Sequence, residues 1–252
     1  MSFVDLRYIF INSSCPTALG AQALGHDDHF QEQRNNHEIS KLVQSYNLDQ
    51  PTFEKMLDLF QNIKTDIIAK YLDFYSRTNK KDLSEAFIKL NEAIEYRALH
   101  SIIHYNSIKE LEKEHFFYYS GTAKDHSSIC YFTLENHTAV DRPSLQKYIH
   151  FLIYTIEKEA EKKGDYYCTL IIDRSRTTME NQDLELVRAM FYHVTLLYPG
   201  STKNILLYPA SITTRILFTI MKSFLHENVI ELVKCIEKKE EFLKYVSEKY
   251  IL

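Results

Sequence analysis

The apolar positions between residues 37 and 114 recur at the spacing of amphipathic helices. Apolar residues follow the i, i+3, i+4, i+7 pattern, which places them on one face of a helix, in four successive stretches. These stretches are 39–46, 53–60, 67–75 and 83–94. A further helix is expected from about His100 to Lys113. The pattern therefore predicts a small α-helical bundle over 37–114.

From His115 onward the pattern changes to short runs of aromatic and β-branched residues. Two such runs, HFFYYS and SSICYFTLE, flank the polar loop GTAKDH and predict a β-hairpin. Helices and apolar strands then alternate, which predicts crossover connections. The expected elements are a helix over 143–164, a strand over 166–172, a helix from 184 that stops before 199, a strand over 205–208, an apolar helix, a strand over 229–236 and a terminal helix over 240–247.

These patterns together predict an α/β protein in three parts. Residues 1–36 form an N-terminal extension to which no element is assigned. Residues 37–114 form the α-helical N-terminal domain. Residues 115–252 form an α/β domain with a mainly parallel mixed β-sheet and flanking helices.

The helix that follows Ser211 is unusual because apolar residues cover well over half of its circumference. They are Ile212, Ile216, Leu217, Phe218, Ile220, Met221, Phe224 and Leu225. A surface helix normally shows one apolar stripe about 100° wide. The segment is shorter than the ~20 residues of a membrane span, and Arg215 and Lys222 interrupt it. Two interpretations stay open: a helix buried in the core, or a lid over a lipid-sized cavity.

Composition narrows the class of protein. The chain of 252 residues is 45% hydrophobic and 25% charged, as in globular proteins. A net charge of −4 carries no electrostatic signature of nucleic-acid binding. The four cysteines form no CxxC pair, and we expect reduced thiols in a cytoplasmic protein. The N-terminus has no apolar run of signal-peptide length. Separately, we expect the protein to be a monomer.

No motif of a known catalyst is present, and no nucleophile–base pair can be assembled from spacing. Asp173 ends a buried strand, which is where open α/β sheets place ligand groups. The next residues, RSRTT, could hold a phosphate or another polar head group, or could form a solvated loop. An enzymatic site around Asp173, Arg174 and Arg176 is the weakest hypothesis. The chain is therefore not expected to be an enzyme.

Histidines suggest metal binding at two places, and neither set is complete. The run His26, Asp27, Asp28, His29 has metal-ligand residue types but no second group nearby. His100 and His104 stand four residues apart with no third ligand. No metal site and no cofactor are expected.

The order of these elements resembles the CRAL-TRIO lipid-binding family, which includes phosphatidylinositol/phosphatidylcholine transfer proteins. Four segments carry the resemblance over about residues 50–252. They are IIAKYLDFY with DLSEAFIKLNEAIEYR, YCTLIID, LLYPGSTKNILLYPAS and IMKSFLHENVIELV. The resemblance implies a non-catalytic carrier in which a sheet and a hinged gate helix, here the apolar helix, enclose one phospholipid or other hydrophobic ligand. Such a carrier meets membrane surfaces transiently and could transfer its lipid between membranes.

The resemblance also implies roles for individual residues. Tyr167, Thr169 and Ile171 would point from the sheet into the pocket, and Thr169 matches a hydroxyl that contacts the phosphate of phosphatidylcholine. The remaining residues complete the predicted site: Ile205 and Leu207 as floor, Phe218, Met221, Phe224 and Leu225 as gate, and Arg215 and Lys222 as membrane contacts.

Two departures from the family concern the lipid head group. Gly200 and Leu232 stand where the transfer proteins carry a Glu and a Lys that contact phosphoinositides. The identity of the lipid therefore stays open. The alternative function is a protein-interaction or regulatory module that kept the fold and lost its ligand.

Overall fold

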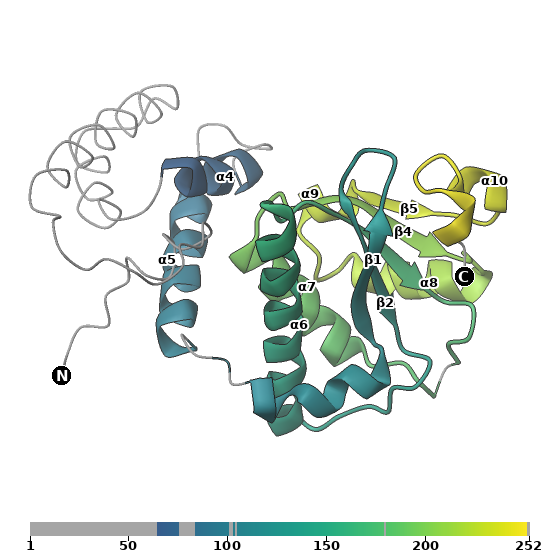
Figure 1. Cartoon of the computed structure of the whole chain (residues 1–252), viewed down its shortest axis with the longest axis horizontal. Helices are drawn as coiled ribbons and strands as arrows, with labels where there is room; N and C mark the ends of the chain where they lie inside the picture. Colours follow the sequence, from purple (N-terminus) through teal and green to yellow (C-terminus); the bar gives the residue numbers. More distant parts are fainter. Residues whose placement is uncertain (1–64, 76–83, 101–102, 104, 179, 251–252) are drawn as a thin grey trace, which may run out of the picture. The chain divides into compact units, whose positions relative to one another are not determined.

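The computed structural model describes two compact units, Met1–Ser101 and Ile102–Leu252, and each is considered by itself (Figure 1). The described residues are 65–75, 84–100, 103, 105–178 and 180–250. The helices expected over 39–60, the cluster from His26 to His29, and His104 lie outside these residues.

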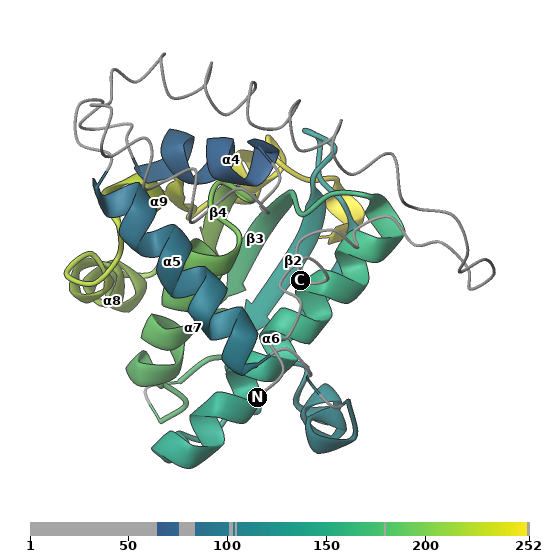
Figure 2. The same ribbon diagram turned by 90° about the vertical axis from the view of Figure 1, so that its left-hand side faces the viewer.

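The described part of the first unit is a pair of adjacent helices, α4 (Thr65–Tyr75) and α5 (Ser84–Leu99) (Figure 2). Both helices coincide with stretches of helical apolar spacing. In α5, Ala86, Leu90 and Ala93 are buried at the spacing i, i+4, i+7, which is the arrangement of one buried helix face.

The second unit is built on a five-stranded sheet. Its strands are β1 (Phe117–Thr122), β2 (Ser128–Thr133), β3 (Cys168–Asp173), β4 (Thr202–Tyr208) and β5 (Val233–Cys235). Their order in the sheet is their order along the chain. β1 is antiparallel to β2, and β2 to β5 are parallel to one another. The predicted hairpin and the mainly parallel mixed sheet are confirmed.

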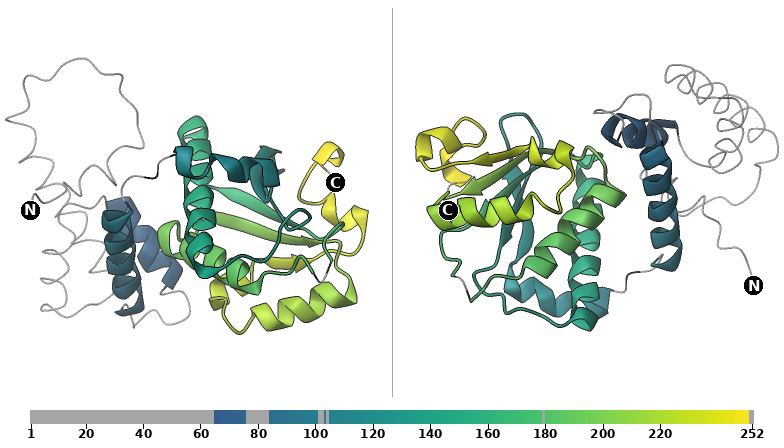
Figure 3. Two further views of the ribbon diagram at one scale, coloured as in Figure 1. Left: turned by 90° about the horizontal axis from the view of Figure 1, so that it is seen from below. Right: turned by 180° about the vertical axis from the view of Figure 1, so that it is seen from behind.

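Helices connect the parallel strands, as the alternating pattern predicts (Figure 3). They are α6 (Arg142–Lys163), α7 (Leu184–Leu197), α8 (Ile212–Met221), α9 (Glu227–Ile230) and, after β5, α10 (Lys239–Phe242). The sequence marks both ends of α6. Asp141 accepts a hydrogen bond from the backbone N–H of Ser144, and Gly164 ends the helix at φ 79°. No helix in the described ranges combines the length and the apolar content needed to cross a membrane.

The two faces of the sheet are covered by different parts of the chain. We call the side that carries Phe132, Ile172 and Leu207, which are neighbours in register, the helical face. On it, Ser128 in β2 donates a hydrogen bond to Glu159 in α6 at 3.4 Å. Consecutive parallel strands joined by right-handed crossovers place their helices on one side of the sheet.

The opposite side carries Tyr131, Ile171 and Leu206, and we call it the C-terminal face. It packs against the last part of the chain, including Phe242 and Val246. In Figure 1 the segment around α10 lies on the side of the sheet away from α6. The sheet is thus buried on both faces, in agreement with the uninterrupted apolar run of β3.

Three expected elements differ in the structure. The helix expected over 100–113 is replaced by two 3₁₀ helices, η1 (Tyr105–Ser107) and η2 (Lys109–Glu114). η2 ends at His115 with a positive φ of 49°. Ile108 and Leu111 are buried, and their spacing of three residues suits one face of a 3₁₀ turn. This segment belongs to the second unit, although the sequence-based boundary was placed after it.

The strand expected over 229–236 is a helical turn followed by a short strand. The imidazole of His226 accepts the backbone N–H of Asn228 and begins α9. Pairing with β4 begins only at Val233. The terminal helix expected over 240–247 is likewise reduced to α10. Phe242 and Val246 bury their side chains on the C-terminal face, so packing on the sheet takes the place of a longer helix.

Candidate functional site

A pocket lies between the helical face of the sheet, α7 and α8. Its floor includes Phe132 of β2, Ile172 of β3 and Leu207 of β4, which stand side by side because the strands are in register. The empty space at the pocket, including the open solvent at its mouth, is about 470 Å³. The part wide enough for water is about 30 Å³, room for one or two water molecules.

The walls of the pocket are two helices with apolar inner faces. α7 contributes Leu184 and Val187, and α8 contributes Leu217, Phe218 and Met221. On α8 these positions are spaced i, i+1 and i+4, so they lie on one side of the helix. The pocket is therefore lined mainly by hydrocarbon, as is usual for sites that hold apolar ligands.

Polar groups gather at one end of the pocket, where β3 ends. Asp173, Arg174, Thr177 and Gln182 all line it there. Nη1 of Arg174 donates to Oε1 of Gln182 at 2.9 Å, and Nε of Arg174 is buried without a hydrogen-bond acceptor among the described residues. Burial lowers the pKa of Arg174, and the charge of Asp173 opposes this shift. The RSRTT segment thus contributes to the pocket rather than forming only a solvated loop.

The wall formed by α7 is anchored by a buried polar cluster. Asp183 accepts the backbone N–H of Leu186 at 2.8 Å and that of Val140 at 3.2 Å. Its Oδ2 also lies 3.0 Å from Nε2 of the buried His137. Nδ1 of His137 is 3.7 Å from a carboxylate oxygen of Glu114. These bonds join η2, the segment after β2 and the N-terminus of α7.

The wall formed by α8 has few polar attachments. Its N-cap, Ser211, accepts the backbone N–H of Thr214 at 3.2 Å. On the outside, Ile212, Ile216 and Ile220 are 80%, 57% and 44% exposed, respectively. They repeat every four residues and form a row, which we call the isoleucine row. The helix is thus apolar on two sides, one toward the pocket and one toward solvent.

The two predicted membrane contacts lie on this helix and just after it. Arg215 forms an exposed ion pair with Glu237. Lys222 places its ammonium 4.9 Å from the ring centroid of Phe218. Both side chains are accessible beside the isoleucine row, but their contact with a membrane remains a prediction.

The pocket brings together some of the predicted lipid-binding residues. Leu207, Phe218 and Met221 all line it. Ile205 is buried on the same face of the sheet as Leu207 but does not line the pocket. Phe224 and Leu225 follow the end of α8 and are outside the lining as well.

The predicted residues of β3 lie elsewhere. Thr169 and Ile171 pair with Asn204 and Leu206, so they point to the C-terminal face. Thr169 is fully buried and its hydroxyl lies 2.8 Å from that of Ser127, while Ile171 belongs to the core on that face. A single pocket on the helical face therefore does not include both Leu207 and Thr169.

Tyr167 precedes β3 and is 39% exposed. Its ring lies under the ammonium of Lys203, 3.8 Å from the ring centroid. The lining residues that sequence reasoning did not select include Phe132, Ile172 and Val187. Side chains alternate between the two faces along β2 and β3, so Phe132 and Ile172 belong to one of two possible sets. Only the register of the strands shows which of these sets faces α8.

In the described part of the chain, no three His, Cys, Asp or Glu side chains gather in a way that could hold a metal ion. His193 lies with Nδ1 2.7 Å from the carbonyl oxygen of Ala189. The pocket thus offers apolar enclosure with a polar end that includes Asp173 and Arg174.

Comparison with protein families agrees with this architecture. The profile of the CRAL/TRIO domain matches residues 112–252, more than half of the chain. The chain belongs to the CRAL/TRIO domain family. This is a family of lipid-binding and lipid-transfer domains whose members are generally not catalysts. The predicted family and the predicted α/β fold are confirmed.

Among solved structures, this CRAL/TRIO chain is similar to the one described as the crystal structure of Sfh5. The TM-score is 0.53 at 11% identity, over 88% of this chain and 85% of that one. At this identity the likeness concerns the fold alone. No curated protein sequence matches the chain significantly.

Proposed function

We propose that this CRAL/TRIO protein binds one phospholipid or other hydrophobic ligand in the pocket between the sheet, α7 and α8. The observation that carries the proposal is the position of α8, which presents an apolar face to the pocket and a second apolar face to solvent. A helix that shields an apolar cavity and also contacts a bilayer needs two apolar faces. The protein then acts as a non-catalytic carrier and transfers its ligand between membranes.

The small size of the pocket requires α8 to move. A site for a drug-sized ligand has a volume of roughly 300–1,000 Å³, whereas the space wide enough for water is about 30 Å³. Each methylene that enters an apolar site gains about 0.8 kcal/mol, so a long acyl chain offsets the contacts that α8 gives up. In this proposal the structure shows α8 in its closed position.

The surface of α8 favours a membrane as the place of opening. The isoleucine row offers three apolar side chains to the bilayer interface. Near anionic lipid, Arg215 and Lys222 would each add about 1 kcal/mol. The low local stability that a gate needs is supported by the few polar attachments of α8.

A second function has its own supporting observation. The pocket as it stands is too small for a lipid, which is also what a protein-interaction module without a ligand would show. Such a module would keep α8 closed and would use the isoleucine row to bind another protein.

Native mass spectrometry of the full chain separates the two functions. A carrier purified gently from cells retains an added mass of a few hundred daltons, and it moves fluorescent phosphatidylcholine between vesicles. A bare mass of 29.8 kDa, with no uptake after incubation with mixed-lipid vesicles, contradicts the carrier and supports the module.

A further inference from the structure

We infer that Arg174 binds a singly charged oxyanion, a carboxylate or a phosphodiester, at the polar end of the pocket. The ligand would then be an amphiphile whose anionic oxygens meet Arg174 and whose hydrocarbon lies against α8. This inference rests on the proposed function, because it specifies the ligand of the same pocket.

The backbone holds Arg174 at the edge of the sheet where the parallel strands end. Its N–H donates to the carbonyl oxygen of Tyr208 at 2.8 Å, which ties the end of β3 to the end of β4. Ligand groups of open α/β sheets are placed at the carboxyl ends of parallel strands. The position therefore suits a residue that recognises a ligand.

The charge of Arg174 is not balanced by a direct ion pair. The charge of Asp173 acts on Arg174, but among the described residues no carboxylate oxygen lies within the ion-pair distance of 4.0 Å from its guanidinium nitrogens. Its partner is the neutral amide of Gln182, and Gln182 is held in place by donating to the carbonyl oxygen of Thr178 at 2.6 Å. Nε of Arg174 is buried and has no acceptor there. Burying such a donor is unfavourable until an acceptor arrives.

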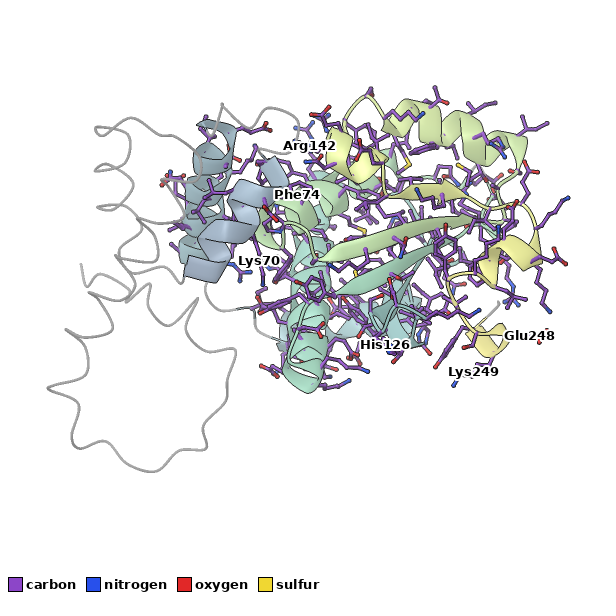
Figure 4. The ribbon with its side chains drawn as sticks, turned by 90° about the horizontal axis from the view of Figure 1, so that it is seen from above. Lys70, Phe74, His126, Arg142, Glu248 and Lys249 are labelled. Atoms are coloured by element: carbon purple, nitrogen blue, oxygen red, sulfur yellow. The ribbon has the colours of Figure 1, made fainter. Side chains whose placement is uncertain are left out.

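Exposed arginines of the same unit are satisfied in another way. Arg176, two residues further on, pairs with Glu135 at 3.2 Å. Arg142, labelled in Figure 4, pairs with Glu185 at 3.3 Å. Arg174 is thus a pocket-lining arginine with an unused donor, where these surface arginines have carboxylate partners.

The geometry of a guanidinium selects the class of ligand. Nε and a neighbouring Nη form a fork that matches two oxygens of a carboxylate or phosphate. Nη1 is already engaged by Gln182, so Nε and Nη2 form the free fork. One guanidinium balances one negative charge, which a carboxylate and a phosphodiester each carry. The hydrocarbon chain of the ligand then lies against the apolar lining, which includes Leu134, Leu217 and Met221.

The test compares three probes that each carry the same kind of long monounsaturated hydrocarbon tail: oleate, oleoyl lysophosphatidylcholine and oleyl alcohol. Each is titrated into the full chain, freed of any retained lipid, and binding is measured by calorimetry. Wild type should bind oleate or oleoyl lysophosphatidylcholine at least about tenfold more tightly than the alcohol. R174Q should lower the affinity for that probe about ten- to a hundredfold and should change the affinity for the alcohol by less than about twofold. The probe whose affinity falls more in R174Q identifies the oxyanion as a carboxylate or a phosphodiester.

A second variant and a matched control guard against a misfolded protein. Gln182→Glu places a carboxylate beside Nη1 of Arg174 while keeping the arginine. It should therefore lower the affinity for the same probe as R174Q does. R176Q removes an exposed charge outside the pocket and should change neither affinity. Thermal unfolding of all variants checks that they fold.

The outcomes distinguish the subsite from the proposed function. If R174Q keeps full affinity for oleate and for oleoyl lysophosphatidylcholine, or loses affinity for the alcohol equally, the anion subsite is wrong and lipid binding stands. If wild type binds none of the three probes, the subsite is wrong, and the carrier function fails as well if the protein also takes up no phosphatidylcholine from vesicles.

Discussion

The helices α7 and α8 wall the same pocket but are attached to the protein in opposite ways. α7 starts at Asp183, whose carboxylate meets Leu186, Val140 and His137 in a buried setting. Most polar bonds of α8 stay within its own turns or, as with Arg215 and Glu237, lie in solvent. The hydroxyl of Thr214 also donates to the carbonyl oxygen of Pro209, just before the helix, at 3.4 Å. Moving α7 would leave buried polar groups without partners, whereas moving α8 exchanges mainly apolar contacts. One pocket thus has a wall held by buried polar bonds, which we call the fixed wall, and a wall held mainly by apolar contacts. In the proposed carrier, the second wall is the one that a lipid displaces.

The largest expected effect comes from breaking the fixed wall. Asp183→Ala removes the cap of α7 and leaves His137 buried without its carboxylate. We expect a loss of about 3 kcal/mol in the free energy of unfolding, measured by urea denaturation of the full chain. Asp141→Ala is the matched control, because Asp141 caps α6 in an exposed setting and should cost only about 1 kcal/mol. Equal losses in the two variants would contradict the contrast between a buried and an exposed anchor.

The outer face of α8 should control membrane binding without affecting folding. Replacing Ile212, Ile216 and Ile220 together by Ser removes three exposed isoleucines. We expect vesicle binding, measured by co-sedimentation, to fall about a hundredfold. The unfolding free energy should change by less than about 0.5 kcal/mol per site, as is usual for exposed positions. Unchanged vesicle binding would show that the row serves another partner.

The inner face of α8 should control lipid retention. Phe218→Asp places a charge in the pocket lining, and we expect the lipid that remains bound in native mass spectrometry to fall about tenfold, since an unpaired charge is costly in an apolar site. Thr219→Asp is the control, because Thr219 is exposed on the same helix and lies outside both the pocket lining and the isoleucine row. An interaction module would tolerate both substitutions, so equal behaviour of the two variants would support that alternative.

The smallest effect is a pH dependence of the fixed wall. Burial raises the pKa of Asp183, but hydrogen bonds from Leu186, His137 and Val140 outweigh it, so the pKa is lowered from 3.8. A lowered carboxyl pKa means that the stabilisation is complete above 3.8 and is lost as the pH falls through the lower, folded-state value. The difference in unfolding free energy between wild type and Asp183→Asn should therefore shrink below that pH. A difference that stays constant from pH 6 to pH 2 would contradict this.

Strongly periodic segments were predictable from the sequence. The helices α6 and α7 and the strand β3 appear where the apolar spacing placed them, and Asp141 and Gly164 mark the two ends of α6. The segments that differed are short and take their conformation from packing. Val229 lies in a short apolar stretch that fits either a strand or a helix, and burial selects a helical turn there. Phe242 lies in a charged segment that was predicted as a longer helix, and its burial accompanies a single short turn.

The pocket was predictable only in part. Phe218 and Met221 were recognised because an apolar helix with excess apolar surface stands out in a sequence. Thr169 was assigned to the same site as Leu207, yet the two residues lie on opposite faces of the sheet. The sequence left open whether the segment that begins with Arg174 holds a phosphate or another polar head group or forms a solvated loop. The unused donor of Arg174 is visible only in three dimensions.

The sequence by itself determined the α/β class, the membership in the CRAL/TRIO domain family and the identity of the helix that covers the pocket. These follow from local spacing and from the order of segments along the chain. The tertiary structure alone decided which residues share the pocket. The reason is the register of β3 against β4, because a shift of one residue between strands moves every side chain to the other face.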